Sequence, residues 1–98
     1  MLTSLLQHFM PSFSAPRNNL KQQREDGLGW TMQQLADFAR RNNIQLSTKT
    51  LGRVESGSGR FAKVTFTRIL RAVNLARTRG GLTALEEADL FPTIRPGN

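Results

Sequence analysis

The sequence predicts an all-α protein, a compact bundle of about five short helices. Three observations support this fold class. The length of 98 residues suits a single hydrophobic core, apolar residues recur at helical spacing in successive segments, and no segment has the pattern of a convincing strand. The composition, with 38% hydrophobic and 21% charged residues, is typical of a folded domain rather than a disordered tail.

Residues 1–15 are expected to form an apolar arm or a short helix. The apolar residues of this segment fall at helical spacing until Pro11 interrupts them. They are Leu2, Leu5, Leu6 and Phe9, with Phe13 after the proline. Residues 16–76 form the main helical domain. Pro16 suits the first turn of its first helix, which ends at the glycines at 27 and 29.

Two capping residues mark the next two helices. Thr31 is a good N-cap for a second helix that ends near residues 41–43. The apolar stripe of this helix is Met32, Leu35, Ala36 and Ala39, flanked by Phe38. Ser47 caps a third helix over residues 48–56, which the glycines at 57 and 59 stop. Leu51 and Val54 point inward from that helix, and Thr50 either joins them or faces outward.

A fourth helix is expected from about Ala62 to Asn74, with a stripe of apolar residues that faces the core. Residues 77–98 then form a linker and a short C-terminal helix. The basic, glycine-ended segment ARTRGG is read as the linker. Thr83 with Glu86 is a capping-box pattern, which opens the short acidic helix that Pro92 stops.

Charge is the most informative bulk property. The net charge is +7, and the segment from Arg17 to Arg79 alone carries thirteen basic and four acidic residues, a net charge of +9. Such a segment attracts polyphosphates by counterion release, whereas the alternative is a basic surface that serves only solubility. No apolar run is long enough to span a bilayer, and the first residues lack the features of a signal peptide, so we expect no membrane contact.

The residues needed for an enzyme are missing. The chain has no cysteine and one histidine, His8, so no catalytic triad, thiolate site or histidine metal cluster can be assembled. Adjacent carboxylates occur only at residues 25–26 and 86–87, where neighbouring helical positions splay apart. The sequence therefore predicts no enzymatic activity, no cofactor and no metal.

The order of motifs between Leu20 and Leu75 carries a family resemblance. Leu20 and Arg24 lie in the first helix, Thr31 precedes QQLA in the second, STKTLGRVESG spans 47–57, and TFTRILRAVNL closes the unit. This arrangement, which covers a little over half of the chain, resembles the Xre/Cro-like (lambda-repressor-like) family of helix-turn-helix transcriptional regulators. The segment FARRNNIQLS is about five residues longer than the tight turn usual in that family. Either the second helix extends or the connector is a loop.

The resemblance implies that residues 48–56 form the recognition helix. B-DNA's major groove admits one helix, and the exposed N-terminal half of that helix meets base edges. The expected base contacts are Thr48, Lys49, Thr50, Gly52 and Arg53. Gly52 either lets the backbone approach DNA or fits a crowded helix crossing. The expected phosphate contacts are Thr31, Gln33, Arg41, Ser47, Arg60 and Lys63, each of whose side chains is otherwise an ordinary solvated surface group.

Two further residues have a structural part in the family. An arginine of the first helix commonly pairs there with the glutamate that ends the recognition helix. The resemblance assigns Arg24 and Glu55 to this ion pair, which locks two helices together rather than contacting DNA.

The resulting functional hypothesis is a sequence-specific repressor that binds double-stranded DNA as a homodimer on a palindromic operator, in the cytoplasm and associated with the nucleoid. An antitoxin that represses its own operon and binds a toxin protein is the alternative. A protein-interaction module without DNA binding is a third reading. Either the apolar arm or the terminal helix supplies the dimer interface, unless both only complete the core.

Overall fold

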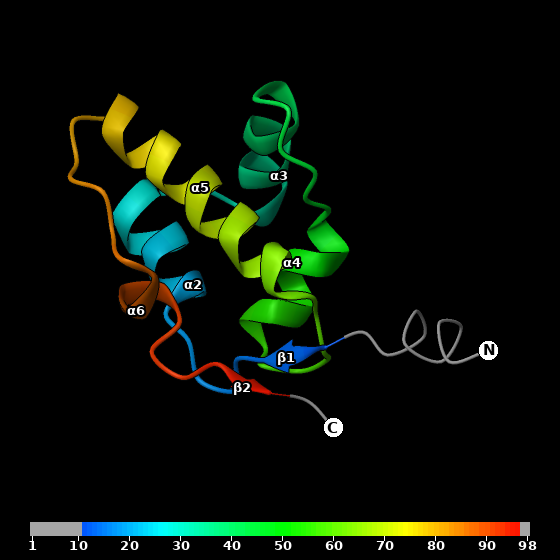
Figure 1. Ribbon diagram of the computed structural model, residues 1–98. Coiled ribbons are helices and arrows are strands. Elements are labelled where there is room, and N and C mark those ends of the chain that lie inside the picture. The colour runs from blue at the N-terminus through cyan, green and yellow to red at the C-terminus, as the bar shows by residue number, and fades with distance from the viewer. Residues whose placement is uncertain (1–10, 97–98) are drawn as a thin grey trace.

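The longest helix in the described part of the chain, α5 (Lys63–Arg79), organises the fold. The computed structural model describes residues 11–96. In Figure 1, α5 crosses the molecule with α3 (Met32–Arg41) on one side, and α4 (Thr48–Glu55) passes across its lower end. On its other side lie α2 (Leu20–Gln22) and α6 (Glu87–Leu90). If α2 and its continuation η1 count as one, residues 11–96 contain five helices in a compact, mostly helical arrangement.

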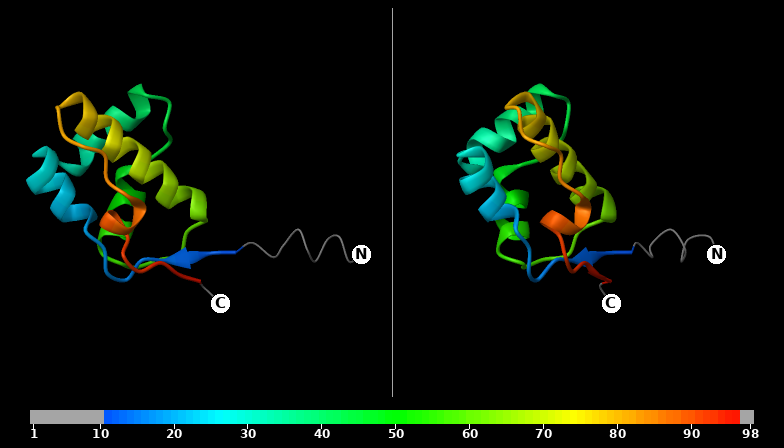
Figure 2. Two further views of the ribbon diagram at one scale, coloured as in Figure 1. Left: turned by 60° about the vertical axis from the view of Figure 1, so that its left-hand side comes forward. Right: turned by 90° about the vertical axis from the view of Figure 1, so that its left-hand side faces the viewer.

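A two-stranded sheet was not predicted, so the all-α expectation is wrong in this respect. The strands β1 (Phe13–Ser14) and β2 (Arg95–Pro96) are antiparallel and lie together at one end of the molecule (Figure 2). Phe13 also exchanges two backbone hydrogen bonds of 2.8 Å with Phe61. Two residues per strand are too few for alternation to be visible in sequence. The predicted arm over residues 1–10 lies outside the described residues.

The predicted N-caps Thr31 and Ser47 are confirmed. Thr31 Oγ1 accepts a hydrogen bond of 3.1 Å from the backbone N–H of Gln34, whose side chain accepts one of 2.8 Å from the Thr31 N–H. Ser47 Oγ accepts from the N–H of Thr50 at 3.0 Å. These bonds satisfy N–H groups that lack partners within the helix, which fixes where each helix begins. The connector between α3 and α4 is a loop, because α3 ends at Arg41.

The first helix begins later than Pro16 predicts. It starts at Leu20 and continues from α2 into η1 (Gln23–Leu28), a π-helix that ends at Gly29 with a positive φ of 70°. Asn18 explains the late start. Its amide oxygen accepts from the N–H of Leu20, while its amide nitrogen donates to backbone carbonyls of residues 15 and 54. These bonds compete with helix formation before Leu20.

The predicted end of the fourth helix at Asn74 is wrong, because α5 continues to Arg79. The supposed basic linker is therefore mostly helix, with Ala76 buried in the same stripe as the preceding apolar residues. Its arginines have tertiary partners. Arg77 Nε donates to the carbonyl of Thr83 at 2.8 Å, and Arg79 donates to the Asn42 side chain at 2.9 Å. These contacts, together with the favourable position of basic residues at a helix C-terminus, stabilise the last turn of α5.

The terminal helix α6 is shorter than predicted and is capped differently. Glu86, rather than Thr83, is its N-cap, and Asp89 completes the capping box by accepting from the Glu86 N–H at 2.8 Å. The segment before α6 is held by Asn74, whose side chain bonds both the N–H and the carbonyl of Leu85, at 2.7 and 2.9 Å. An extended segment bound in this way cannot also form the first turn of a helix.

The core lies between α5 and the helices on both of its sides. Leu20, Leu35, Leu51, Phe66, Ile69 and Leu90 are among its fully buried side chains. Phe66 meets Phe91 edge to face, with ring centroids 5.1 Å apart, so α6 is part of this core. Among residues 11–96, no helix has the length and apolarity needed to cross a bilayer.

Candidate nucleic-acid interface

A buried ion pair fixes α4 to the first helix. Arg24 Nε lies 2.7 Å from Glu55 Oε2, and Arg24 Nη2 lies 2.9 Å from Glu55 Oε1, as the sequence predicts for these two residues. Nη1 donates to the Trp30 carbonyl at 2.7 Å. Both charged side chains are less than a tenth exposed. The hydrogen bonds to Glu55 raise the pKa of Arg24 above its ordinary value, although burial acts in the opposite direction.

The exposed face of α4 is polar and positively charged. Thr48, Lys49 and Arg53 are exposed, while Leu51 and Val54 on the opposite face are buried. Within residues 11–96, neither Thr48 nor Lys49 has a hydrogen-bond or ion-pair partner. Side chains that are exposed and unpaired remain available for an external ligand. The two at the N-terminal end of α4 are therefore the most accessible of the predicted base-contacting residues.

Arg53 is exposed but has partners within the protein. Its guanidinium carbon lies 5.3 Å from the ring centroid of Phe61, in the arrangement of a cation–π contact. It also covers Gly59, because a Cβ placed on that glycine would lie 2.6 Å from Arg53 Nη2. Arg53 is therefore directed toward the loop after α4, so its guanidinium must leave or share this contact to reach a base.

The other two predicted base-contacting residues, Thr50 and Gly52, are less exposed to solvent. Thr50 is half-buried, and its hydroxyl accepts a hydrogen bond of 3.0 Å from Ser47 Oγ. Gly52 faces Met32 of α3, where an added Cβ would lie 3.6 Å from the sulfur atom. That distance is an ordinary van der Waals contact. Packing against α3 therefore does not by itself require a glycine at this position.

The predicted phosphate contacts fall into two groups. Thr31 and Ser47 have their hydroxyls committed to helix caps, and Gln33 donates its amide to Asp37 at 2.9 Å. The second group consists of exposed cations. Arg41 lies at the end of α3, whereas Arg60 and Lys63 lie beside the loop that follows α4.

Lys63 has an acidic neighbour and an aromatic neighbour. Its Nζ lies 3.7 Å from Glu87 Oε2 and 5.7 Å from the ring centroid of Phe13. Because the two charged side chains are about half exposed, this ion pair is weak and can exchange for a phosphate. Arg53, Arg60 and Lys63 thus form a basic group near Phe13 and Phe61.

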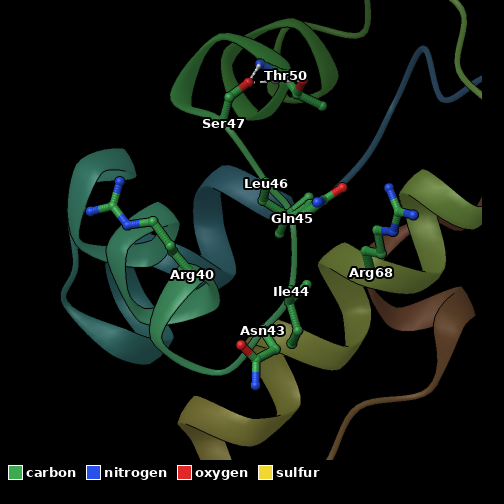
Figure 3. Close-up of a pocket in the computed structure, with 8 residues that line it drawn as sticks. All are labelled: Arg40, Asn43, Ile44, Gln45, Leu46, Ser47, Thr50 and Arg68. Atoms are coloured by element: carbon green, nitrogen blue, oxygen red, sulfur yellow. Dashed lines mark hydrogen bonds between the residues drawn. The ribbon is translucent and has the colours of Figure 1, made fainter.

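A hollow of about 780 Å³ follows the connector between α3 and α4. In Figure 3, the connector runs upward from Asn43 to Ser47, with Arg40 on one side and Arg68 on the other. Ser47 and Thr50 lie at the start of α4. Arg40 is paired with Asp37 at 2.7 Å. Arg68 comes from α5 and was not predicted as a site residue, because helical periodicity only places it on the outside of its own helix. The structure adds it to the cations around α4.

Within the described part of the chain, no group of three or more His, Asp or Glu side chains is arranged to hold a metal ion. The arrangement around α4 offers hydroxyl, ammonium and guanidinium groups, which donate hydrogen bonds to oxygen and nitrogen acceptors. A scan against family models and searches among curated proteins and solved structures found no match to this chain.

Proposed function

We propose that this protein is a sequence-specific DNA-binding regulator in which α3 and α4 form a helix-turn-helix of the lambda-repressor-like kind. In this proposal α4 is the recognition helix and enters the major groove of double-stranded DNA. The observation that carries the proposal is the exposed, unpaired N-terminal face of α4, held in a fixed orientation by the buried pair of Arg24 and Glu55. A helix presented in this way meets the requirement for reading base edges.

The charges around α4 support the same proposal. Arg53, Arg60 and Lys63 lie at its C-terminal side, and Arg40, Arg41 and Arg68 lie near the loop at its N-terminal side. Base-reading helices need phosphate contacts on both sides, because these set the register of the helix in the groove. The basic groups flank α4 as that geometry requires.

We further propose that the protein acts as a repressor in the form of a homodimer, since one recognition helix reads too few base pairs for useful specificity. A shallow groove of about 360 Å³ on the outer face of α5 is our candidate for the contact surface. It is lined by Thr67, Leu70, Arg71, Asn74, Leu75 and Thr78. A palindromic operator is the expected consequence of a two-fold dimer.

The experiment that tests the function is selection of bound duplexes from a random pool, followed by anisotropy titrations of the selected site and of a scrambled site. A two-fold symmetric consensus that binds at least tenfold more tightly than the scramble supports the repressor. Absence of binding to any duplex at low salt would contradict it and favour a protein-interaction module. Co-purification of a second small protein, together with duplex binding, would favour the alternative of an autoregulating antitoxin.

A further inference from the structure

A small cavity beside β2 brings two arginines together. Its volume is about 330 Å³, and it is lined by Pro16, Arg17, Thr93 and Arg95. Both arginines are exposed, and neither side chain has a hydrogen-bond or ion-pair partner among residues 11–96. Two guanidinium groups that share a cavity repel each other unless an anion lies between them. The cavity therefore has the charge and the donor groups of an anion site.

The sheet orients Arg95 toward the side of the molecule that carries Arg60. Phe13 pairs with Phe61 on one edge and with β2 on the other, so three segments lie side by side. Phe13 and Phe61 both pack against the core. Because side chains alternate along an extended chain and cross-strand partners share a face, the residue paired with Ser14, Arg95, points away from the core. Arg60, the chain neighbour of Phe61, is exposed beside this pairing.

The other wall of the cavity is attached to the end of α4. Gly57, just after α4, has a φ of +77°, and a Cβ there would lie 2.5 Å from the carbonyl oxygen of Pro16. Asn18 donates to the carbonyl of Val54, within the last turn of α4, at 2.8 Å. The segment that carries Arg17 is therefore packed directly on the C-terminal end of the proposed recognition helix. The cavity therefore lies beside the C-terminal end of α4, next to the segment that Gly57 and Val54 contact.

We propose that Arg17 and Arg95 together bind one phosphate diester of the DNA backbone, next to the phosphates expected at the loop after α4. The proposal rests on the proposed DNA-binding function and extends it to residues near both ends of the described range 11–96. Guanidinium groups bind phosphate oxygens through pairs of parallel hydrogen bonds. The Thr93 side chain offers one more hydroxyl donor at the same cavity.

The test compares two double variants that each remove two positive charges. Arg17→Gln/Arg95→Gln removes the proposed phosphate site, whereas Lys21→Gln/Arg79→Gln removes exposed cations of α2 and of the last turn of α5. Anisotropy titrations of a short duplex of arbitrary sequence are run over a series of salt concentrations. We expect the arginine variant to bind every duplex roughly eightfold more weakly at about 0.1 M salt, and its salt slope to fall by about one unit. The control variant should bind within about twofold of wild type, because neither of its cations belongs to the proposed DNA-contacting groups.

Each outcome has a distinct meaning. If wild type binds DNA and the arginine variant behaves like the control, this inference is overturned while the proposed function stands. If wild type binds no duplex, the proposed DNA-binding function is overturned, and this inference is overturned with it. A third arm titrates the protein with inorganic phosphate and follows the arginine Nε–H signals by NMR. Saturable shifts at Arg17 and Arg95, with duplex binding unaffected by their substitution, would assign the cavity to a free anion and overturn the DNA contact.

Discussion

Removing the carboxylate of Glu55 should destabilise the protein far more than removing an exposed charge. Glu55→Ala deletes two hydrogen bonds, of 2.7 and 2.9 Å, and leaves the buried Arg24 guanidinium with the Trp30 carbonyl and the half-exposed Glu25, whose Oε2 lies 3.7 Å from Nη2. Hydrogen bonds to charged groups contribute about 1.5–3 kcal/mol each. Breaking a buried pair by removing one partner costs about 3–5 kcal/mol, which is the loss we expect in the free energy of unfolding. Arg40→Ala breaks an exposed pair with Asp37 and should cost no more than about 1 kcal/mol.

Urea denaturation followed by fluorescence measures both effects, because Trp30 is the single tryptophan and packs on Phe38 with ring centroids 5.1 Å apart. The double variant Arg24→Met/Glu55→Leu should recover most of the loss, since two apolar side chains leave no unpaired charge in the interior. The raised pKa of Arg24 means that its contribution is lost only as the pH rises through the folded-state pKa, so Arg24 adds no pH dependence around neutrality. A loss below about 1 kcal/mol for Glu55→Ala, or a double variant as unstable as the single one, would refute this reasoning.

Four more predictions concern residues elsewhere in the chain. Gly57→Ala should destabilise the protein more than Gly81→Ala in thermal melts, because both glycines have positive φ but only the first would place its Cβ against backbone; equal shifts would contradict this. Asn74→Ala should cost about 1–3 kcal/mol and speed amide exchange in the segment before α6, and unchanged exchange there would count against the two bonds as its anchor. In DNA titrations, Lys49→Ala should weaken the selected site by roughly 1–3 kcal/mol with little effect on scrambled duplexes. Lys63→Ala should weaken all duplexes alike and lower the salt slope by about one, so identical profiles for the two lysine variants would argue against separate base and phosphate contacts.

The sequence predicts the local features of the fold well. Thr31 and Ser47 mark helix starts because their hydroxyls satisfy nearby backbone N–H groups, an interaction within three residues. Helical periodicity identifies the buried faces of α3 and α4 for a similar reason. The pair of Arg24 and Glu55 is long-range, and it could be predicted only from the resemblance to a family.

The features that the sequence does not predict depend on contacts between distant segments. In the sequence, the last turns of α5 have the composition of a charged linker. In the structure they are helical, and Arg77 and Arg79 donate hydrogen bonds to Thr83 and Asn42. The strand at Phe13 exists only because residues far along the chain pair with it. For the candidate site, periodicity identifies the exposed face of α4, but no sequence pattern shows that Arg53 covers Phe61. The cavity of Arg17 and Arg95 is likewise invisible in sequence, because it depends on the same pairing of the two chain ends.

The pairing of β1 with β2 also has a kinetic consequence. Ser14 and Arg95 lie near opposite ends of the described chain, and Asn19 donates its N–H to the carbonyl of Leu90 at 2.8 Å. Closing so long a loop carries a large entropic cost, so β1 and β2 should pair only after the helices have packed together. It should also open first, as a local unfolding event that leaves the α3–α4–α5 contacts intact. Local separation of β1 from β2 would then change the surface beside α4 while the core stays folded.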